Sequence, residues 1–415
     1  MKILTIVWSI GVGGTERAAV NYAIGYRQYG HDSKVLVLGE GNERLAELQE
    51  AGVDTCFSQE DKRGAEIVFA EFNKWAPDII HLHNFTNAFL PYLDKIKTES
   101  TKVVETNHFS RPNFTEEYKA VSLSMQLSQW GYWKYTRWMK NAAYIPQVAI
   151  VPNIINAKKF TTPSRESISS FLQLHGIPAN AFVAGRLGQA HPSKWDSRIF
   201  EVAERTANPE NNIYYLFVGM PAVMIKELEG KTDFIKSRIK LIPSIDGDEN
   251  LSLYYRSLNC FAHISKIGES FGYVLTEAMM CSVPVITMLT PFHDNAQFEV
   301  VEHNYGGICV TDTKGFVSAV MQLYNSPADC EQFKKNLSEH WVENRFAAAA
   351  VTPKQIEYFL QLRAGKQITA RDVSAVIKNC FAMYGASKHI MYFFLKLYNC
   401  RTSFLFLRCI KRTLK

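Results

Sequence analysis

The sequence lacks closely spaced cysteines. Its 415 residues include eight cysteines, all scattered singly, and none forms a Cys-x-x-Cys pair. Structural zinc sites and disulfide frameworks depend on such clusters, so the spacing favours neither. Disulfides persist in oxidising compartments, and a chain without a disulfide pattern fits a reducing one. We therefore expect a cytoplasmic protein.

The sequence also lacks a long, uninterrupted apolar run. A membrane-spanning helix needs about 20 such residues, but Lys396 and Arg401 interrupt the apolar stretches of residues 388–412. The apolar run within residues 1–10 is too brief for a signal peptide with a cleavage site, and it fits a buried first strand better. Neither a spanning helix nor a secretion signal is therefore expected.

Acidic residues are absent after Asp372. The same stretch carries eight basic residues, which leaves a net charge of −2 on residues 1–372 out of a total of +6. A nearly neutral body argues against nucleic acid as a partner. The bases and apolar residues of the tail favour peripheral contact with an anionic membrane face. The alternative is that the tail packs on the N-terminal domain and its bases only face solvent.

Apolar strands alternate with helical stretches along most of the chain. Residues 2–8 form a continuous apolar run typical of a strand buried on both faces. The alternation predicts an α/β protein with doubly wound parallel sheets. The length of the chain, 415 residues, predicts two domains. Further predicted strands are 33–38, 78–83, 102–106, 118–122, 182–185, 214–219, 238–242, 260–265 and 283–287. Predicted helices include 15–30, 43–51, 63–75, 87–97, 314–324, 328–339 and 353–363, with others starting near Trp195 and Leu251.

The alternating pattern restarts after a polar stretch between Pro152 and Pro163, which we interpret as a linker. The N-terminal domain is accordingly placed at residues 1–151 and the second domain at 152–345. Residues 346–415 are expected to form a crossover helix and the basic, aromatic tail.

The most specific segment runs from Glu269 to Glu277. Glu269 lies in a loop after a buried strand, and Glu277 lies about one turn into the following helix. Phe271 and Gly272 bring backbone N–H groups to the helix N-terminus, where a diphosphate can be held. A carboxylate on the first turns can accept both hydroxyls of a ribose. For an isolated Glu the alternative is simple helix capping.

This segment, continued by residues 281–287, resembles the E-x7-E signature of glycosyltransferase family 4, which has the GT-B fold. The resemblance extends over most of residues 1–345. It implies two Rossmann-like domains that face each other across a cleft. Other segments that resemble the family are the glycine loop at Gly13 and Gly14, residues 78–83, 106–108 and 151–156, the pair Gly185-Arg186, and Lys194.

The resemblance also implies a retaining transfer of a hexose-type sugar from a UDP- or GDP-linked donor to a glycan or lipid-linked acceptor. Arg186 and Lys194 match bases that neutralise the leaving diphosphate. Glu269 would lie beside the transferred sugar, Glu277 would hold the ribose, and His108 would hydrogen-bond the sugar near its reacting carbon. Because fixed bases supply the positive charge, neither a metal nor a cofactor is expected. The remaining donor-binding positions are Gly13, Gly14, Ser270, Phe271 and Gly272.

Three features depart from the family pattern. Extra residues lengthen the spacing between Arg186 and Lys194, which makes the assignment of Lys194 weaker than that of Arg186. The loop that follows strand 283–287 is not the usual short glycine loop before Glu299. The acceptor-side loop after His108 is short and rich in aromatic residues.

Several other polar or aromatic groups allow two interpretations. His81 and His83 alternate on one predicted strand, so we expect one of them to face the sheet interior. Asp246-Gly-Asp248 resembles a metal-binding Asp-x-Asp motif, but its place before a predicted helix favours capping by an acid of the first turn. The run 130–140 fits either a membrane-facing helix or an amphipathic helix packed on the N-terminal sheet.

Competing functions are weaker. The first glycine turn partly fits a dinucleotide-binding fingerprint, with Glu40 on the ribose, but its third glycine is absent. That assignment also leaves Arg186, Glu269 and Glu277 without a role. A sugar-nucleotide epimerase, or an inactive sugar-nucleotide-binding protein of the same architecture, stays open as the alternative.

Overall fold

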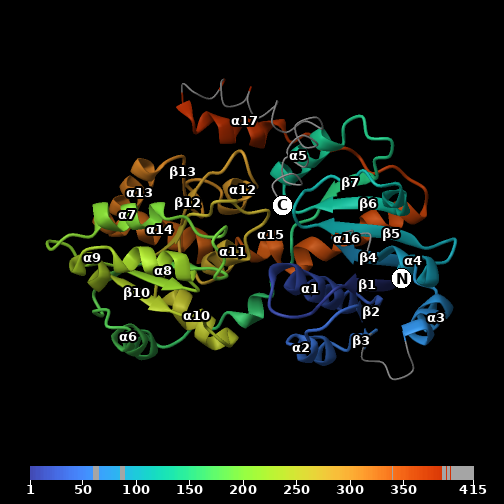
Figure 1. The fold of residues 1–415 in the computed structure, drawn as a ribbon, viewed down its shortest axis with the longest axis horizontal. Coiled ribbons are helices and arrows are strands. Elements are labelled where there is room, and N and C mark those ends of the chain that lie inside the picture. Colours follow the sequence, from blue (N-terminus) through green and yellow to red (C-terminus); the bar gives the residue numbers. More distant parts are fainter. Residues whose placement is uncertain (59–64, 85–88, 339, 386–388, 390–392, 394–415) are drawn as a thin grey trace. The chain divides into compact units, whose positions relative to one another are not determined.

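The computed structural model describes residues 1–58, 65–84, 89–338, 340–385, 389 and 393 (Figure 1). The chain divides into two compact units. Unit 1 contains Met1–Asn156 and Arg345–Ile377, and unit 2 contains Ala157–Asn344 and the described part of Lys378–Tyr392. Each unit is built around one parallel sheet.

Unit 1 has a seven-stranded sheet in the order β3-β2-β1-β4-β5-β6-β7. Its strands are β1 (Lys2–Val7), β2 (Asp32–Val37), β3 (Asp54–Phe57), β4 (Ile79–His83), β5 (Lys102–Asn107), β6 (Val121–Gln126) and β7 (Gln147–Ile150). Its helices are α1 (Gly14–Gln28), α2 (Leu45–Glu50), α3 (Ala65–Trp75), α4 (Leu90–Ile96), α5 (Gln129–Met139) and α16 (Ala348–Arg363).

The core of unit 1 follows from its apolar patterns. All residues of β1 except Lys2 are buried, as a strand covered on both faces requires. The predicted apolar face of α1 is confirmed, because Ala18, Ala19, Tyr22, Ala23 and Tyr26 are all buried. The late helix α16 returns to this unit. Its Phe359 ring lies 5.9 Å from the Tyr26 ring of α1.

Unit 2 has a six-stranded sheet in the order β10-β9-β8-β11-β12-β13. Its strands are β8 (Phe182–Leu187), β9 (Ile213–Val218), β10 (Ile239–Ile242), β11 (Cys260–His263), β12 (Val285–Met288) and β13 (Gly307–Val310). Its helices are α6 (Arg165–Leu174), α7 (Arg198–Thr206), α8 (Ala222–Glu229), α9 (Asp233–Arg238), α10 (Asp248–Arg256), α11 (Tyr273–Met280), α12 (Gln297–Val301), α13 (Thr313–Asn325) and α14 (Pro327–Ser338). Two further helices, α15 (Glu343–Phe346) and α17 (Ser374–Ala382), cross the division between the units.

Both sheets reverse their strand order at one point. In unit 1 the reversal lies between β1 and β4, and in unit 2 it lies between β8 and β11. In doubly wound sheets, ligands bind beyond the carboxyl ends of the strands at such a switch point. The topology therefore directs attention to the residues that end these four strands and to the loops that follow them.

The structure corrects several predicted elements. The strand predicted at 118–122 is wrong at its start, because Glu116–Ala120 is a 3-10 helix and β6 begins at Val121. The buried Tyr118 hydroxyl instead bonds to Glu105 and lies 2.8 Å from the Tyr135 hydroxyl. The last predicted helix starts earlier than proline preference suggested, since α16 contains Pro353 in its interior.

The aromatic run 130–140 forms α5, which buries Trp130, Tyr132, Tyr135, Trp138 and Met139. This burial favours the packed helix over the membrane-facing one. No helix in the described ranges is long and apolar enough to cross a membrane. Most of the basic tail, from residue 394 onward, lies outside the described residues.

Candidate active site

The switch point of unit 2 gathers three charged side chains and a histidine. Arg186 lies on β8, His263 ends β11, and Glu269 lies in the loop that follows β11. Lys194 comes from the loop after β8. The two strands are direct neighbours, with Phe261 beside Gly185 in register. These four side chains therefore lie at the same edge of the sheet, although they come from the ends of two different strands, β8 and β11.

Arg186 is almost completely buried, with 1% of its surface exposed. Its Nη1 lies 2.7 Å from Nδ1 of His263, its Nη2 donates to the Lys194 carbonyl, and its guanidinium carbon lies 4.6 Å from the centre of the Trp195 ring. Burial lowers the pKa of Arg186 to about 10. It therefore stays cationic at neutral pH and adds a fixed positive charge beneath the site.

Glu269 is held through both its backbone and its carboxylate. Its N–H donates to Oε1 of Gln297 at 3.1 Å, and its carbonyl accepts from the Ala296 N–H at 2.8 Å. Lys194 Nζ lies 3.3 Å from Glu269 Oε2. Burial alone would raise the pKa of Glu269, but the neighbouring Lys194, His263 and Arg186 outweigh it and lower the pKa to about 2. The group is thus an ionised carboxylate at neutral pH.

Lys194 differs from Arg186 in its access to solvent. Its side chain is 32% exposed, while that of Glu269 is 11% exposed. An exposed ammonium can reach a bound phosphate directly, whereas the buried guanidinium contributes through its charge and through the Lys194 carbonyl. Although the spacing between Arg186 and Lys194 is longer than in the family pattern, Lys194 still contacts the Glu269 carboxylate.

The loop before Glu299, which departs from the family pattern, supports Glu269. Gln297 Nε2 donates to the Met288 carbonyl and to Thr290 Oγ1, while its Oε1 holds the Glu269 N–H. Asn295 donates in turn to the Cys380 sulfur of α17 at 3.1 Å. This loop thus ties the backbone of Glu269 to β12 and α17.

The segment after Glu269 opens helix α11. Gly272 is its N-cap residue, in the left-handed region with φ 90°, which favours glycine. Phe271 is buried beside it. Glu277 lies about one turn into α11, as predicted. Its Oε2 accepts a hydrogen bond of 2.9 Å from the buried Tyr255 hydroxyl. The N-terminus of α11 and an oriented carboxylate therefore follow Glu269 directly.

The switch point of unit 1 carries the predicted glycines. Gly13 is the N-cap residue of α1, and Gly14 is its first residue. A Cβ at Gly13 would lie 2.0 Å from Oε2 of Glu16, so a side chain there would displace that carboxylate. The two glycines therefore open a helix N-terminus immediately beyond β1.

Three buried histidines lie on β4 and just after β5 in the same unit. His108 lies just after β5, and its Nε2 is 3.0 Å from Nδ1 of His83. His81 contacts the Tyr26 hydroxyl and Thr106 Oγ1, at 2.9 and 2.8 Å. Burial lowers the pKa of His81 and His108 to about 3. Both His81 and His83 face the interior, where the sequence predicted one.

The structure brings Arg186, Lys194 and Glu269 into one cluster and puts His108 at the strand edge of unit 1. Four further predicted positions share the loop and helix start after β11: Ser270, Phe271, Gly272 and Glu277. Sequence reasoning missed His263 and Tyr255. His263 could have been predicted as a site residue, because it ends a buried strand. No feature of the sequence indicated a site role for Tyr255 within α10.

Asp248 has an ordinary structural role. It is an acid of the first turn of α10, as expected, and its Oδ2 lies 3.3 Å from Lys159 Nζ. Within the described ranges, no group of three or more His, Cys, Asp or Glu residues is arranged to hold a metal ion.

Both sheets are doubly wound. The switch point of unit 2 carries the charged cluster, and that of unit 1 carries the glycine turn and the buried, neutral histidines. Such switch points are typical of nucleotide-binding enzymes. The family model described as Glycosyltransferase Family 4 matches residues 12–183, and the one described as Glycosyl transferases group 1 matches residues 171–340. The chain therefore belongs to glycosyltransferase family 4. No curated sequence matches it.

Solved structures share the GT-B fold at low identity. HepE of Anabaena, in complex with UDP and glucose, has a TM-score of 0.68 at 19% identity and covers 87% of this chain and 99% of its own. A glycosyltransferase from Rickettsia africae has a TM-score of 0.69 at 15% identity, with coverages of 87% and 98%. The pneumococcal O-GlcNAc transferase GtfA, in complex with UDP and GlcNAc, has a TM-score of 0.64 at 11% identity, with coverages of 87% and 99%.

Proposed function

We propose that the protein is a retaining glycosyltransferase that moves a hexose-type sugar from a UDP- or GDP-linked donor to a glycan or lipid-linked acceptor. The cluster of Arg186, Lys194 and Glu269 at the switch point of unit 2 carries this proposal. The UDP bound in HepE and in GtfA supports a UDP-linked donor over a GDP-linked one.

The cluster suits the charges that develop during transfer. Breaking the bond between sugar and phosphate leaves a diphosphate with additional negative charge. The buried charge of Arg186 and the N-terminus of α11 are already in place to stabilise that charge, and Lys194 can turn toward it. The ionised Glu269 accepts hydrogen bonds from sugar hydroxyls, and Glu277 accepts those of the ribose. The neutral His108 donates or accepts a hydrogen bond at the sugar.

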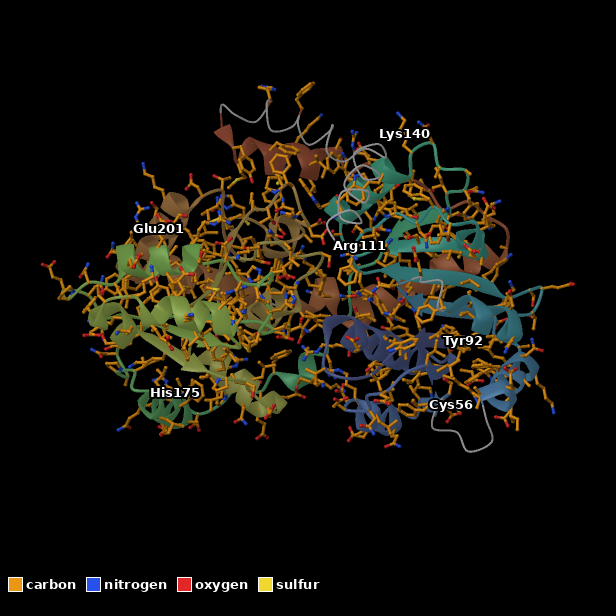
Figure 2. All side chains as sticks on the ribbon, in the orientation of Figure 1. Cys56, Tyr92, Arg111, Lys140, His175 and Glu201 are labelled. Atoms are coloured by element: carbon orange, nitrogen blue, oxygen red, sulfur yellow. The ribbon has the colours of Figure 1, made fainter. Side chains whose placement is uncertain are left out.

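Donor hydrolysis by the purified full-length protein tests the donor half of this proposal. We expect slow release of UDP from a UDP-hexose, and Glu269→Ala or Arg186→Ala to reduce turnover by about a hundredfold or more, as for loss of a preorganised charge. Glu201→Ala and Arg205→Ala are matched controls. They form an exposed ion pair of 3.1 Å on α7, where Figure 2 labels Glu201. Equal activity in all four variants would place the site elsewhere.

The configuration of the product tests the retaining assignment. NMR of the freshly formed glycoside should show the anomeric configuration of the donor. An inverted product would refute retention. Isomerisation of the donor without acceptor would instead identify an epimerase, and nucleotide binding without any turnover would identify a binding protein.

The acceptor half rests on the basic tail. We propose peripheral attachment to an anionic membrane face, which would bring the site to a lipid-linked acceptor. The full-length protein should sediment with anionic vesicles, less so at high salt, and a chain ending at Gly385 should not. Truncation at Lys366 would be unsuitable, because the Ile368 N–H donates to Gln147 and Cys380 bonds to Asn295. Full-length protein that ignores vesicles would refute the attachment.

A further inference from the structure

His263 stands between two residues of the donor site. It ends β11 and is buried, with Phe261 of the same strand stacked on its ring. Its Nδ1 lies 2.7 Å from Nη1 of Arg186, and its Nε2 lies 3.3 Å from Oε1 of Glu269. The imidazole therefore connects the buried cation to the carboxylate, each through a different ring nitrogen.

The contact with Arg186 fixes where the imidazole carries its hydrogen. A guanidinium only donates hydrogen bonds, so the Nδ1 atom that faces it must present a lone pair. A neutral imidazole with an unprotonated Nδ1 carries its hydrogen on Nε2. A doubly protonated ring would instead oppose two N–H groups at 2.7 Å. The ring is neutral at physiological pH, because burial and the charge of Arg186 lower the pKa of His263 to about 4 against the opposing influence of Glu269.

The hydrogen on Nε2 then faces the Glu269 carboxylate. In the described part of the chain, Nε2 makes no well-aligned hydrogen bond, and the Glu269 carboxylate oxygen 3.3 Å away is the acceptor that it faces. The other carboxylate oxygen lies 3.3 Å from Lys194 Nζ. One oxygen thus meets a buried, neutral donor at the end of β11, and the other meets a partly exposed ammonium on a long side chain that is able to turn toward a phosphate.

We propose that His263 is a positioning residue, locked by Arg186 in its Nε2–H tautomer, that orients the Glu269 carboxylate toward the donor sugar. The proposal rests on the proposed function for its consequence, but not for the tautomer. It explains how Glu269 keeps one orientation when Lys194 moves to the diphosphate. Under this proposal Arg186 acts at both ends of the donor. Its charge stabilises the diphosphate, and through His263 it orients the carboxylate that faces the sugar.

The tautomer is tested without any activity measurement. The full-length protein is labelled with 15N-histidine, and His263 is assigned from the signals that disappear in His263→Gln. We expect a protonated Nε2 and an unprotonated Nδ1 at pH 7. A hydrogen on Nδ1, or a cationic ring at that pH, would overturn the proposal whether or not the protein hydrolyses a nucleotide sugar.

Two substitutions separate the two contacts. Glutamine in His263→Gln places an amide N–H near the former Nε2, and asparagine in His263→Asn places a carbonyl near the former Nδ1 but nothing near Glu269. For hydrolysis of a UDP-hexose we expect kcat to fall further in the Asn variant than in the Gln variant, by about tenfold, with a similar KM. The acid limb of kcat should also shift to higher pH in the Asn variant only, because Glu269 loses a donor while Lys194 and Arg186 remain.

The outcomes are distinct. Equal kcat in the two variants, with thermal stabilisation by UDP intact in both, would refute the positioning role. If the wild-type protein binds UDP but hydrolyses no donor, the proposed function fails, and the 15N signals still decide whether Arg186 locks the tautomer. If neither variant folds, His263 is assigned in the wild-type spectrum from through-bond connectivity to its backbone signals, and that spectrum decides alone.

Discussion

Nδ1 of His83 lies 3.0 Å from Nε2 of His108, and the two rings are stacked with their centres 5.3 Å apart. One ring must donate and the other must accept, so at most one proton is shared between these two atoms. Burial lowers the pKa of both, and that of His83 is lowered further by His81 and His108. The histidine that resembles the family's active-site residue is therefore neutral at physiological pH.

The pKa values of the site residues predict how turnover depends on pH. The pKa values are about 3 for His108, about 4 for His263, about 2 for Glu269 and about 10 for Arg186. None of these groups titrates between about pH 5 and 8. We expect kcat for donor hydrolysis to be flat across that range. A limb near pH 6.5 that disappears in His108→Gln would contradict the assignment.

The buried His81 predicts a loss of stability in acid. Its pKa of about 3 lies below the usual value of 6.5, mainly through burial. Between those values only the unfolded chain takes up the proton, so the free energy of unfolding falls as the pH falls below 6.5. His81→Leu removes this dependence. Although the variant is less stable at pH 7, its deficit should shrink by about 2 kcal/mol at pH 5.

Melting curves at pH 7.5 and 5.0 measure this difference. His191→Leu is a control, because this histidine is exposed in the loop after β8. Parallel dependence of the melting temperature on pH in the wild type and in His81→Leu would show that His81 is protonated in the folded state.

The Tyr255 hydroxyl orients Glu277, so its removal should affect nucleotide binding rather than chemistry. We expect Tyr255→Phe to raise the KM for the donor about fivefold with little change in kcat, because one hydrogen bond to a carboxylate is lost. Tyr215→Phe is the matched control, since the hydroxyl of this buried tyrosine of β9 contacts Thr206 in the core. A fall in kcat with KM unchanged would give Glu277 a different role.

Metal independence is a prediction about Asp246 and Asp248. Asp248 pairs with Lys159 at the start of α10, and Lys194 and Arg186 already supply positive charge beside Glu269. Activity should survive EDTA, and the double variant Asp246→Ala/Asp248→Ala should change turnover little. Abolition by EDTA with rescue by Mg or Mn would contradict this.

Much of the fold could be predicted because it depends on local patterns. Buried parallel strands such as β1 are continuous apolar runs, and α1 shows a clear apolar face. Three strands of four residues, β3, β7 and β13, were not predicted. The edge strand β3, for example, has no fully buried residue. Period and hydrophobicity carry little signal in such four-residue strands.

The site was predictable in its charged residues but not in their connections. Arg186 and Glu269 could be found because the pair Gly185-Arg186 and the segment from Glu269 to Glu277 resemble motifs of the family. That His263 lies between them depends on β8 and β11 being neighbours, although 77 residues separate Arg186 from His263 along the chain. Likewise, the support of Glu269 by Gln297 depends on two loops meeting after β11 and β12.

The approach of those two loops leads to a prediction at Gly268. This residue has φ 63°, and a Cβ there would lie 1.8 Å from the Asp294 carbonyl oxygen and 2.2 Å from Thr290 Oγ1. Gly268→Ala must therefore push apart the loops after β11 and β12 and shift Glu269, the next residue. We expect turnover to fall by about a hundredfold, since a displacement of about 1 Å at reacting groups has that effect.

Gly247→Ala is the control that separates crowding from backbone strain. Gly247 has φ 84°, and nothing lies within 4 Å of a Cβ built on it. Both substitutions put alanine at a positive φ, which strains the backbone at either position, but only the first crowds the Asp294 carbonyl. The melting temperature should fall slightly in the control and turnover should not. If both variants lose activity equally, the strain of α10 reaches the site and the contact between the two loops is not what holds Glu269.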